Sequence, residues 1–207
     1  MPLLKQWTEE DAVFAVWKVS ETADELSGML TADLPYGEEI ALLKAESRKL
    51  EYLAVRVLLR TLCGEEKHIL HYPSGKPFLK DASFRISISH TKGYVAIGLH
   101  PFKELGIDIE CVSGRVCKVA SRFMHPDELK VSDNLMYLLV CWSGKETMYK
   151  LLGEEGVDFS CHLRISPFEL QQNGVCDAYE YRTSRKQCFS LHYMLHSDFV
   201  CTWCVAL

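Results

Sequence analysis

The order of helix and strand signals is the same in both halves of the chain, and this repetition restricts the fold more than any other sequence feature. In the first half, apolar periodicity over residues 44–64 predicts a helix that ends at a glycine, and period-two alternation over residues 84–100 predicts strand, turn and strand. In the second half, residues 134–153 predict another helix ending at a glycine, and residues 186–207 predict a second strand–turn–strand unit. The chain is therefore expected to contain two units of like design.

Helix and strand signals are mixed without strict β–α–β alternation, which predicts an α+β fold. We expect two similar lobes related by pseudo-twofold symmetry, each a helix packed on an antiparallel sheet. The predicted lobes are residues 1–103 and residues 104–207, with a boundary near residues 102–105. A chain of 207 residues is long enough to form two small lobes that share an interface.

The composition narrows the class of protein. A formal net charge of −5 gives no support to a general role in nucleic-acid or membrane-surface binding. The N-terminal residues include acidic side chains and no continuous apolar stretch of the length that a signal peptide needs, so we expect no signal peptide. No segment approaches the length of a transmembrane helix. Nine cysteines are an odd count, which is more typical of reduced, mostly buried thiols than of a set of disulfides, so we expect a cytoplasmic protein.

The predicted helix at residues 134–153 carries charges within an apolar sequence. On a helical projection Glu146 falls within a stripe of large apolar side chains, and the opposite side is apolar as well, so we expect the helix to be enclosed. Lys150 follows four residues later, where an ordinary surface ion pair could form. An enclosed carboxylate, however, needs a compensating cation or metal, which favours a functional site.

A second charged stretch reads ELGIDIE, residues 104–110. As a strand, it places Asp108 and Glu110 on one face together with Gly106. A solvated acidic strand face is the simpler interpretation. Combined with Glu146, however, the pair supplies three carboxylates, the ligands that suit Mg²⁺, which usually completes its coordination with water and substrate phosphates. This combination predicts a phosphorylated substrate.

Several cationic or polar side chains could hold such a substrate. Lys76 lies in the turn-like PSGKPFL segment, and Ser89 and His90 lie at a predicted strand end, where hydroxyl, imidazole and turn amides can converge on an anion. Arg48 and Arg56 lie in the first predicted helix. Each residue alone is equally compatible with a surface or structural role.

Four motifs together resemble a known family. GIDIE, followed by WSGKETMYK, resembles the paired signature of the 4′-phosphopantetheinyl transferase superfamily, and the upstream segments GKPFL and ISISHTKGYVAI are similar to that family's GKP and SHS segments. The resemblance covers about residues 48–159. Thr147 and Thr91 depart from the family pattern without removing a charged group. The length and the two like halves resemble the surfactin-synthetase-activating branch, which is a pseudo-dimer within one chain.

The resemblance implies a reaction: transfer of the 4′-phosphopantetheine arm of coenzyme A to a serine of an apo acyl or peptidyl carrier protein, with release of adenosine 3′,5′-bisphosphate. It implies that Asp108, Glu110 and Glu146 bind Mg²⁺, with Mn²⁺ as an alternative. Glu146 would also act as the base for the serine hydroxyl. Lys150 would neutralise charge on the leaving pyrophosphate oxygen, and Asp108 would share the catalytic work as a metal ligand.

The resemblance also implies where coenzyme A binds and what the partners are. We expect one cleft between the lobes, one active site in each chain, and a monomer with an internal pseudo-dimer. The basic segment YRTSRK, residues 181–186, is a candidate for carrier docking, although a solvated turn explains it equally well. The residues expected to bind the co-substrate coenzyme A are Arg48, Lys76, Pro77, Ser89, His90, Lys145 and Lys150.

Two alternatives remain open at this stage. The protein could be a coenzyme A-binding module without transfer activity, which would add no mass to any apo carrier protein. It could also be a metal-dependent phosphodiesterase that uses the acidic pair, which would consume coenzyme A or nucleotides in the absence of a carrier.

Overall fold

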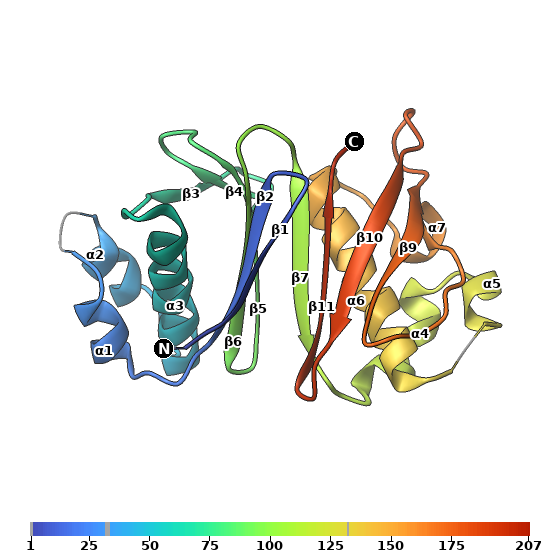
Figure 1. The fold of residues 1–207 in the computed structure, drawn as a ribbon, viewed down its shortest axis with the longest axis horizontal. Coiled ribbons are helices and arrows are strands. Elements are labelled where there is room, and N and C mark those ends of the chain that lie inside the picture. The colour runs from blue at the N-terminus through green and yellow to red at the C-terminus, as the bar shows by residue number, and fades with distance from the viewer. Residues whose placement is uncertain (1, 32–33, 132) are drawn as a thin grey trace. The chain divides into compact units, whose positions relative to one another are not determined.

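The structure is a computed structural model that describes residues 2–31, 34–131 and 133–207. The chain divides into two compact units, Met1–Phe102 and Lys103–Leu207, so the division lies one residue before the expected position. Each unit contains a long helix packed against an antiparallel sheet, which confirms the predicted α+β class (Figure 1). In the part of the chain that is described, no helix is both long and apolar enough to cross a bilayer.

The first unit is built on a four-stranded antiparallel sheet in the order β1-β2-β6-β5, with helix α3 against one face (Figure 1). Apolar side chains of α3 pack against those of β2, β5 and β6 to form the core of this unit. The elements of the sheet and its main helix are β1 (Leu3–Glu9), β2 (Ala12–Lys18), β5 (Arg85–Thr91), β6 (Tyr94–His100) and α3 (Glu46–Cys63). The smaller elements are α1 (Ala23–Gly28), α2 (Tyr36–Ala41) and the two-stranded β3 (Ile69–His71) and β4 (Pro77–Leu79).

The second unit has a five-stranded antiparallel sheet in the order β7-β11-β10-β9-β8, with helix α6 against it. Three short helices lie beside α6 and help to cover its buried face. The strands are β7 (Leu105–Cys111), β8 (Leu163–Ile165), β9 (Asn173–Glu180), β10 (Cys188–Leu195) and β11 (Phe199–Val205). The helices are α4 (Arg115–Phe123), α5 (Pro126–Leu129), α6 (Leu135–Leu152) and α7 (Phe159–His162).

Both long helices begin and end where their sequences predict. The side chain of Asn134 accepts hydrogen bonds from two backbone N–H groups in the first turn of α6, which satisfies donors that the helix itself cannot. Gly153 and Gly64 terminate α6 and α3 in the left-handed conformation, with φ of 62° and 75°. This conformation is nearly free of strain only for glycine. The two predicted glycine stops are thus confirmed.

Candidate active site

The acidic motif lies on β7, the edge strand that pairs with β11. Asp108 and Glu110 are two residues apart and share one strand face with Gly106, as the alternation predicts. Asp108 is buried, and Glu110 is partly buried. The absence of a side chain at Gly106 matters, because a Cβ atom there would overlap the backbone carbonyl of Thr147. The glycine therefore lets α6 approach β7 closely enough to bring the helix charges to the strand carboxylates.

Helix α6 is enclosed, as predicted. Most of its residues are buried, and the buried residues are not confined to one face of the helix. Gly144 fits against Leu191 and Ile165 of the sheet, where a larger residue would overlap them. The hydroxyl groups of Ser143 and Thr147 lie 2.9 Å and 2.6 Å from Oγ1 of Thr202. Thr147, one of the two departures from the family pattern, thus links α6 to β11 rather than disturbing it.

Lys150 connects the helix to the acidic strand. Its Nζ donates a 2.6 Å hydrogen bond to Oδ1 of Asp108 and a 3.2 Å bond to the backbone oxygen of Ile107. The ion pair is charge-assisted and shielded, since Asp108 is buried and the lysine side chain is only 25% exposed. The sequence suggested an ion pair between Lys150 and Glu146 within the helix. In the structure, Lys150 pairs instead with Asp108 on the strand.

Glu110 is held by an indole. Nε1 of Trp142 donates a 2.8 Å hydrogen bond to Oε1 of Glu110. The Trp142 ring also packs edge-on against Phe123 and lies 5.7 Å from the ring of Phe159. Trp142, the first residue of the WSGKETMYK motif, therefore fixes the orientation of a proposed ligand, a role that sequence reasoning did not assign to it.

The carboxylates affect one another's ionisation. Burial raises the pKa of Glu146 to about 7, and the charges of Asp108 and Glu110 add to this shift while Lys150 opposes it. Burial, together with the charge of Asp108, also raises the pKa of Glu110, although the bond from Trp142 works in the opposite direction. Glu146 is thus poised to hold or release a proton near neutral pH, as a general base requires.

The donor set suits a hard cation, but its present arrangement is not a finished metal site. Among the described residues, no group of three or more His, Cys, Asp or Glu side chains is placed to hold a metal ion. Lys150 and Trp142 occupy oxygens of Asp108 and Glu110 that a cation would use. Asp108, Glu110 and Glu146 nevertheless have the oxygen chemistry that Mg²⁺ prefers, and the charge of Asp108 contributes to the raised pKa of the two glutamates.

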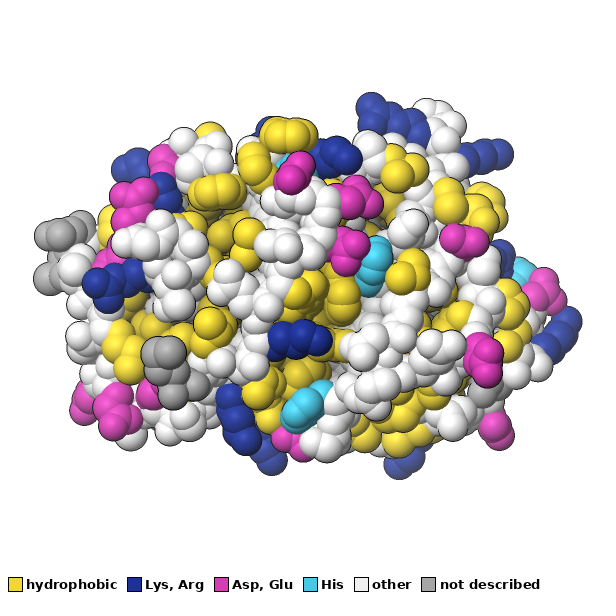
Figure 2. Space-filling model, viewed as in Figure 1, with side chains coloured by type: hydrophobic (Ala, Val, Ile, Leu, Met, Phe, Trp, Pro, Cys, Tyr) yellow, Lys and Arg dark blue, Asp and Glu magenta, His cyan; other side chains and the backbone are white. Residues whose placement is uncertain are grey.

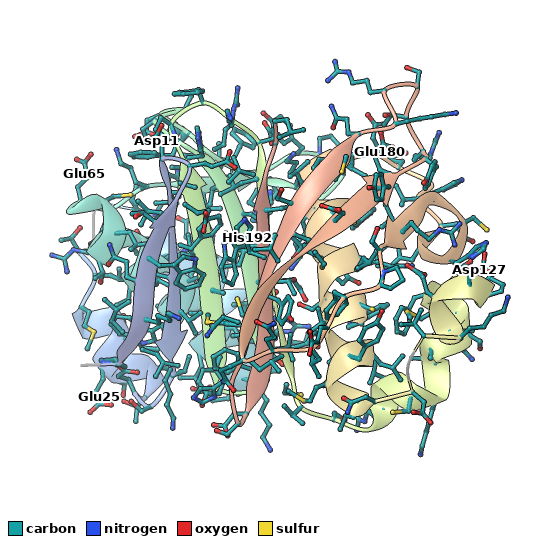
Figure 3. All side chains as sticks on the ribbon, turned by 45° about the vertical axis from the view of Figure 1, so that its right-hand side comes forward. Asp11, Glu25, Glu65, Asp127, Glu180 and His192 are labelled. Carbon is teal, nitrogen blue, oxygen red and sulfur yellow. The ribbon has the colours of Figure 1, made fainter. Side chains whose placement is uncertain are left out.

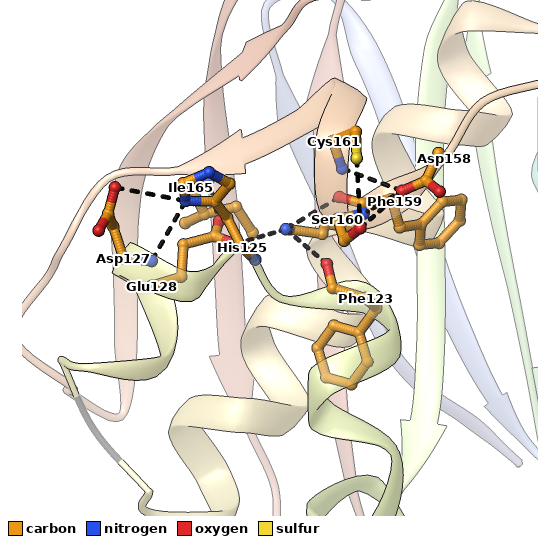
Figure 4. Close-up of polar contacts among 10 residues, drawn as sticks. Phe123, His125, Asp127, Glu128, Asp158, Phe159, Ser160, Cys161 and Ile165 are labelled. Atoms are coloured by element: carbon orange, nitrogen blue, oxygen red, sulfur yellow. Dashed lines mark hydrogen bonds and ion pairs between the residues drawn. The ribbon is translucent and has the colours of Figure 1, made fainter.

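Lys145 does not point toward these groups, contrary to the expectation that it binds phosphates. It is fully buried, and its Nζ donates to Oε2 of Glu128 at 2.6 Å and to the backbone oxygens of Phe123 and Phe159 (Figure 4). Burial lowers the pKa of Lys145, which the charge of Glu128 counteracts. The carboxylate is held in turn by the backbone N–H groups of His125 and Ile165. Lys145 therefore fastens the short helices to α6.

In the first unit, Arg48 and His90 line the same pocket. Both were candidates for binding coenzyme A. Nη1 of Arg48 lies 3.3 Å from Nε2 of His90, and Oε2 of Glu51 lies 3.0 Å from Arg48 and 3.5 Å from Nδ1 of His90. The pocket has a volume of about 360 Å³ and includes Pro77 in its wall. An exposed, ion-paired arginine next to a histidine is suited to exchange its carboxylate partner for a phosphate.

A buried network forms the rear of the same pocket. The Arg56 guanidinium lies 3.2 Å from the ring centroid of Tyr52 and 3.0 Å from Oε2 of Glu39, which also accepts a 2.6 Å hydrogen bond from the Tyr52 hydroxyl. Burial alone would raise the pKa of Glu39, but the Tyr52 bond and the Arg56 charge lower it. His71 completes this wall, and its pKa is lowered by burial and by Arg56. These partners come from α2, α3 and β3, so no local motif could reveal them.

The remaining predicted residues have different positions. Ser89 and His90 lie near the end of β5, as predicted, but as consecutive strand residues they face opposite sides of the sheet and do not converge on one anion. Ser89 is buried, whereas the side chain of His90 is 38% exposed. Lys76 precedes β4, and its neighbours Gly75 and Pro77 line the pocket.

The two units thus combine an α+β architecture with a carboxylate–lysine cluster and a separate cationic pocket. Residues 104–204, which make up most of the second unit, match the model of the 4′-phosphopantetheinyl transferase superfamily. The match includes Asp108, Glu110, Glu146 and Lys150, and it supports phosphopantetheine transfer as the general activity of this unit. No curated protein matched the chain.

Proposed function

We propose that the protein transfers the 4′-phosphopantetheine group of coenzyme A to a serine of an apo acyl or peptidyl carrier protein and releases adenosine 3′,5′-bisphosphate. The observation that carries the proposal is the cluster on β7 and α6, in which Asp108 meets Lys150 and the pKa of Glu146 is raised to about 7. The proposal includes the surfactin-synthetase-activating branch, which the length of the chain and its two like halves resemble. We further propose that the reaction takes place in the cytoplasm, by a monomer with one active site.

The proposed roles follow from the chemistry of each group. Glu146 takes the proton of the incoming serine hydroxyl, since its pKa lies near neutral pH. Lys150, held in place by Asp108, stabilises the negative charge that develops on the leaving pyrophosphate oxygen. In phosphoryl-type transfer, positioning and electrostatics supply most of the rate, so few groups are needed.

We propose that Asp108, Glu110 and Glu146 hold Mg²⁺, for which Mn²⁺ could substitute. Bound there, the ion would polarise the pyrophosphate and lower the cost of three neighbouring negative charges. Trp142 would fix the orientation of the Glu110 carboxylate through its 2.8 Å hydrogen bond.

We propose that the pocket of the first unit holds the 3′-phosphate and adenine end of coenzyme A. Arg48 and His90 are the proposed anion-binding groups, with Pro77 as part of the wall, and Lys76 and Ser89 remain secondary candidates. Lys145 is removed from this set because its ammonium group is already surrounded by three oxygens.

We propose that the carrier protein contacts the basic turn between β9 and β10. Arg182, Arg185 and Lys186 are exposed there, and Figure 2 shows basic side chains over this turn at the upper right. Glu180, labelled in Figure 3, holds the backbone of this turn in place. Its carboxylate accepts hydrogen bonds from the backbone N–H groups of Thr183 and Gln187. An ordered cationic turn on a chain of net charge −5 is suited to an acidic partner.

The direct test is to incubate the protein with coenzyme A, Mg²⁺ and a panel of apo carrier domains and to weigh each carrier. We expect one phosphopantetheine group to be added to at least one carrier, and Glu146→Gln to lower the rate by at least about 100-fold while the fold is retained. Near wild-type activity in this variant would refute the assignment of the base. Consumption of coenzyme A without any carrier would instead identify a phosphodiesterase.

One observation favours a second candidate, a coenzyme A-binding module without transfer activity. Lys150 and Trp142 occupy the oxygens of the strand carboxylates, and no three-ligand metal group is formed among the described residues. Calorimetry separates the two functions: a module would bind coenzyme A with no dependence on Mg²⁺ and would leave every carrier unmodified.

A further inference from the structure

A small pocket with several polar residues in its lining lies in the second unit, outside the proposed active site. It has a volume of about 280 Å³ and is formed by α5, by β8 and the residues that follow it, and by the end of β9. Its polar lining includes the side chains of Arg164, Ser166, Tyr179 and Tyr181. The proposed chemical step and the family motifs use none of these residues, while Tyr181 is also the first residue of the basic segment proposed for carrier docking, residues 181–186.

Arg164 is the group that needs an explanation. Its Nη1 atom is buried and has no hydrogen-bond acceptor among the described residues, and no ion pair to this arginine is found there. A buried N–H group without an acceptor destabilises the folded state, and more so when the group is charged. Burial also lowers the pKa of Arg164. The chain thus keeps a cation partly out of water without giving it an anion.

The acidic residues of the same pocket do not supply that anion. Both oxygens of Glu128 are engaged, one by Lys145 and the other by the backbone N–H of Ile165 (Figure 4). The carboxylate of Asp127, which Figure 3 places at the outer edge of α5, pairs with Lys130 at 2.9 Å. Each acid therefore has its own lysine, and the charge of Arg164 remains uncompensated within the pocket.

We propose that this pocket binds the oxyanion group of a small ligand, a carboxylate or a phosphate, on the guanidinium of Arg164. The planar fork of N–H donors matches two oxygens of such a group, and Tyr181 in the same lining carries a hydroxyl group that can act as a further donor. A ligand would supply the acceptor that the buried nitrogen lacks. The proposal is independent of the proposed transferase function.

The test is residue-resolved NMR of the full-length protein, titrated separately with inorganic phosphate and with acetate while chloride keeps the ionic strength constant. We expect saturable shifts of the Arg164 Nε–H signal and of the amides of Ile165 and Ser166. Saturation by phosphate alone identifies a phosphate site, by acetate alone a carboxylate site, and by both a general oxyanion site. Shifts that grow linearly in both titrations, or that appear only around Arg48 and His90, would overturn the proposal.

Two variants and a control make the result specific. Arg164→Gln should raise the dissociation constant of the anion at least ten-fold. Arg164→Lys keeps the charge but not the planar fork, so it should weaken binding less. The lysine variant also serves as the test if the glutamine variant does not fold. Arg182→Gln is the control, because Arg182 is an exposed arginine of the same unit that donates to the backbone oxygen of Glu155. Unchanged binding in both Arg164 variants would also refute the site.

Discussion

At the scale of single residues, the cluster on β7 and α6 shows how a few side chains share an unfavourable charge. Lys150 neutralises Asp108, Trp142 holds Glu110, and Glu146 responds to burial and to both neighbours with a pKa of about 7. The consequence is an electrostatic strain that protonation or a bound cation would relieve.

This strain predicts an unusual pH dependence of stability. The pKa of the Glu146 carboxyl is about 7 in the folded protein and 4.5 in the unfolded chain. The folded state therefore binds the proton more tightly. The resulting stabilisation is fully present below pH 4.5 and is lost as the pH rises to about 7, with a total of up to about 3 kcal/mol. Glu146→Gln should therefore be more stable than the wild type by about 1–3 kcal/mol at pH 8 in EDTA.

Denaturant unfolding of both proteins at several pH values measures the effect. The difference between them should close as the pH falls toward 4.5. A constant difference across this range would show that Glu146 does not titrate as described, whatever its role in turnover.

Asp108 gives a second prediction, which concerns the proposed metal. Asp108→Asn removes one anionic ligand and the partner of Lys150, so we expect the Mg²⁺ concentration for half-maximal activity to rise at least ten-fold. Titration of activity with Mg²⁺ is the measurement. Asp177→Asn on β9 is the control and should leave the titration unchanged, and an unaltered curve for Asp108→Asn would refute the ligand role.

At the scale of helices and strands, two glycines determine how closely α6 packs. Gly106 makes room for the backbone of Thr147, and Gly144 makes room for Leu191 and Ile165. The positions of Glu146 and Lys150 relative to β7 thus depend on residues that have no chemistry of their own.

Gly106→Ala should separate α6 from β7. The added methyl would overlap a backbone carbonyl, which cannot rotate away, so we expect a loss of about 1–3 kcal/mol of unfolding free energy. Activity should fall with it, because the Lys150–Asp108 pair spans the same contact. Gly28→Ala in α1, where a methyl meets open space, is the control; equal effects of the two variants on thermal unfolding would argue against the packing role.

The elements that sequence analysis predicted are those with strong local signals. Helices α3 and α6, both hairpins and β7 were predicted, because glycine stops, an N-cap and period-two alternation are all local. Strand β2 was missed, since AVFAVWK is a continuous apolar run that periodicity cannot assign to helix or strand. The direction of Lys145 was also missed, because its partner Glu128 lies on α5, a four-residue helix with no helical period of its own.

At the scale of the whole molecule, the two units carry different chemistry on similar frameworks. The long helix of each unit has 18 residues, but α3 presents Arg48 and Arg56 to a pocket, whereas α6 presents Glu146 and Lys150 to a strand. If the proposed function is correct, binding and chemistry should be separable by mutations in different units.

His90→Ala tests this division. We expect the dissociation constant for coenzyme A, measured by calorimetry, to rise about ten-fold, because the variant loses one donor to a charged phosphate. The turnover of the saturated enzyme should change less than three-fold. His196→Ala, in the turn before β11, is the control for a general effect of losing a histidine; a turnover defect without weaker binding would contradict the proposed role of His90.

The coordination of Lys145 has a consequence for how the WSGKETMYK motif is to be interpreted. Its two lysines would look equivalent in any screen that scores only lost activity, yet Lys145 holds short helices to α6, whereas Lys150 pairs with Asp108 in the proposed active site. A neutral substitution at Lys145 leaves the buried carboxylate of Glu128 without its cation, so we expect less soluble protein on expression. The same substitution at Lys150 should leave the yield of soluble protein unchanged.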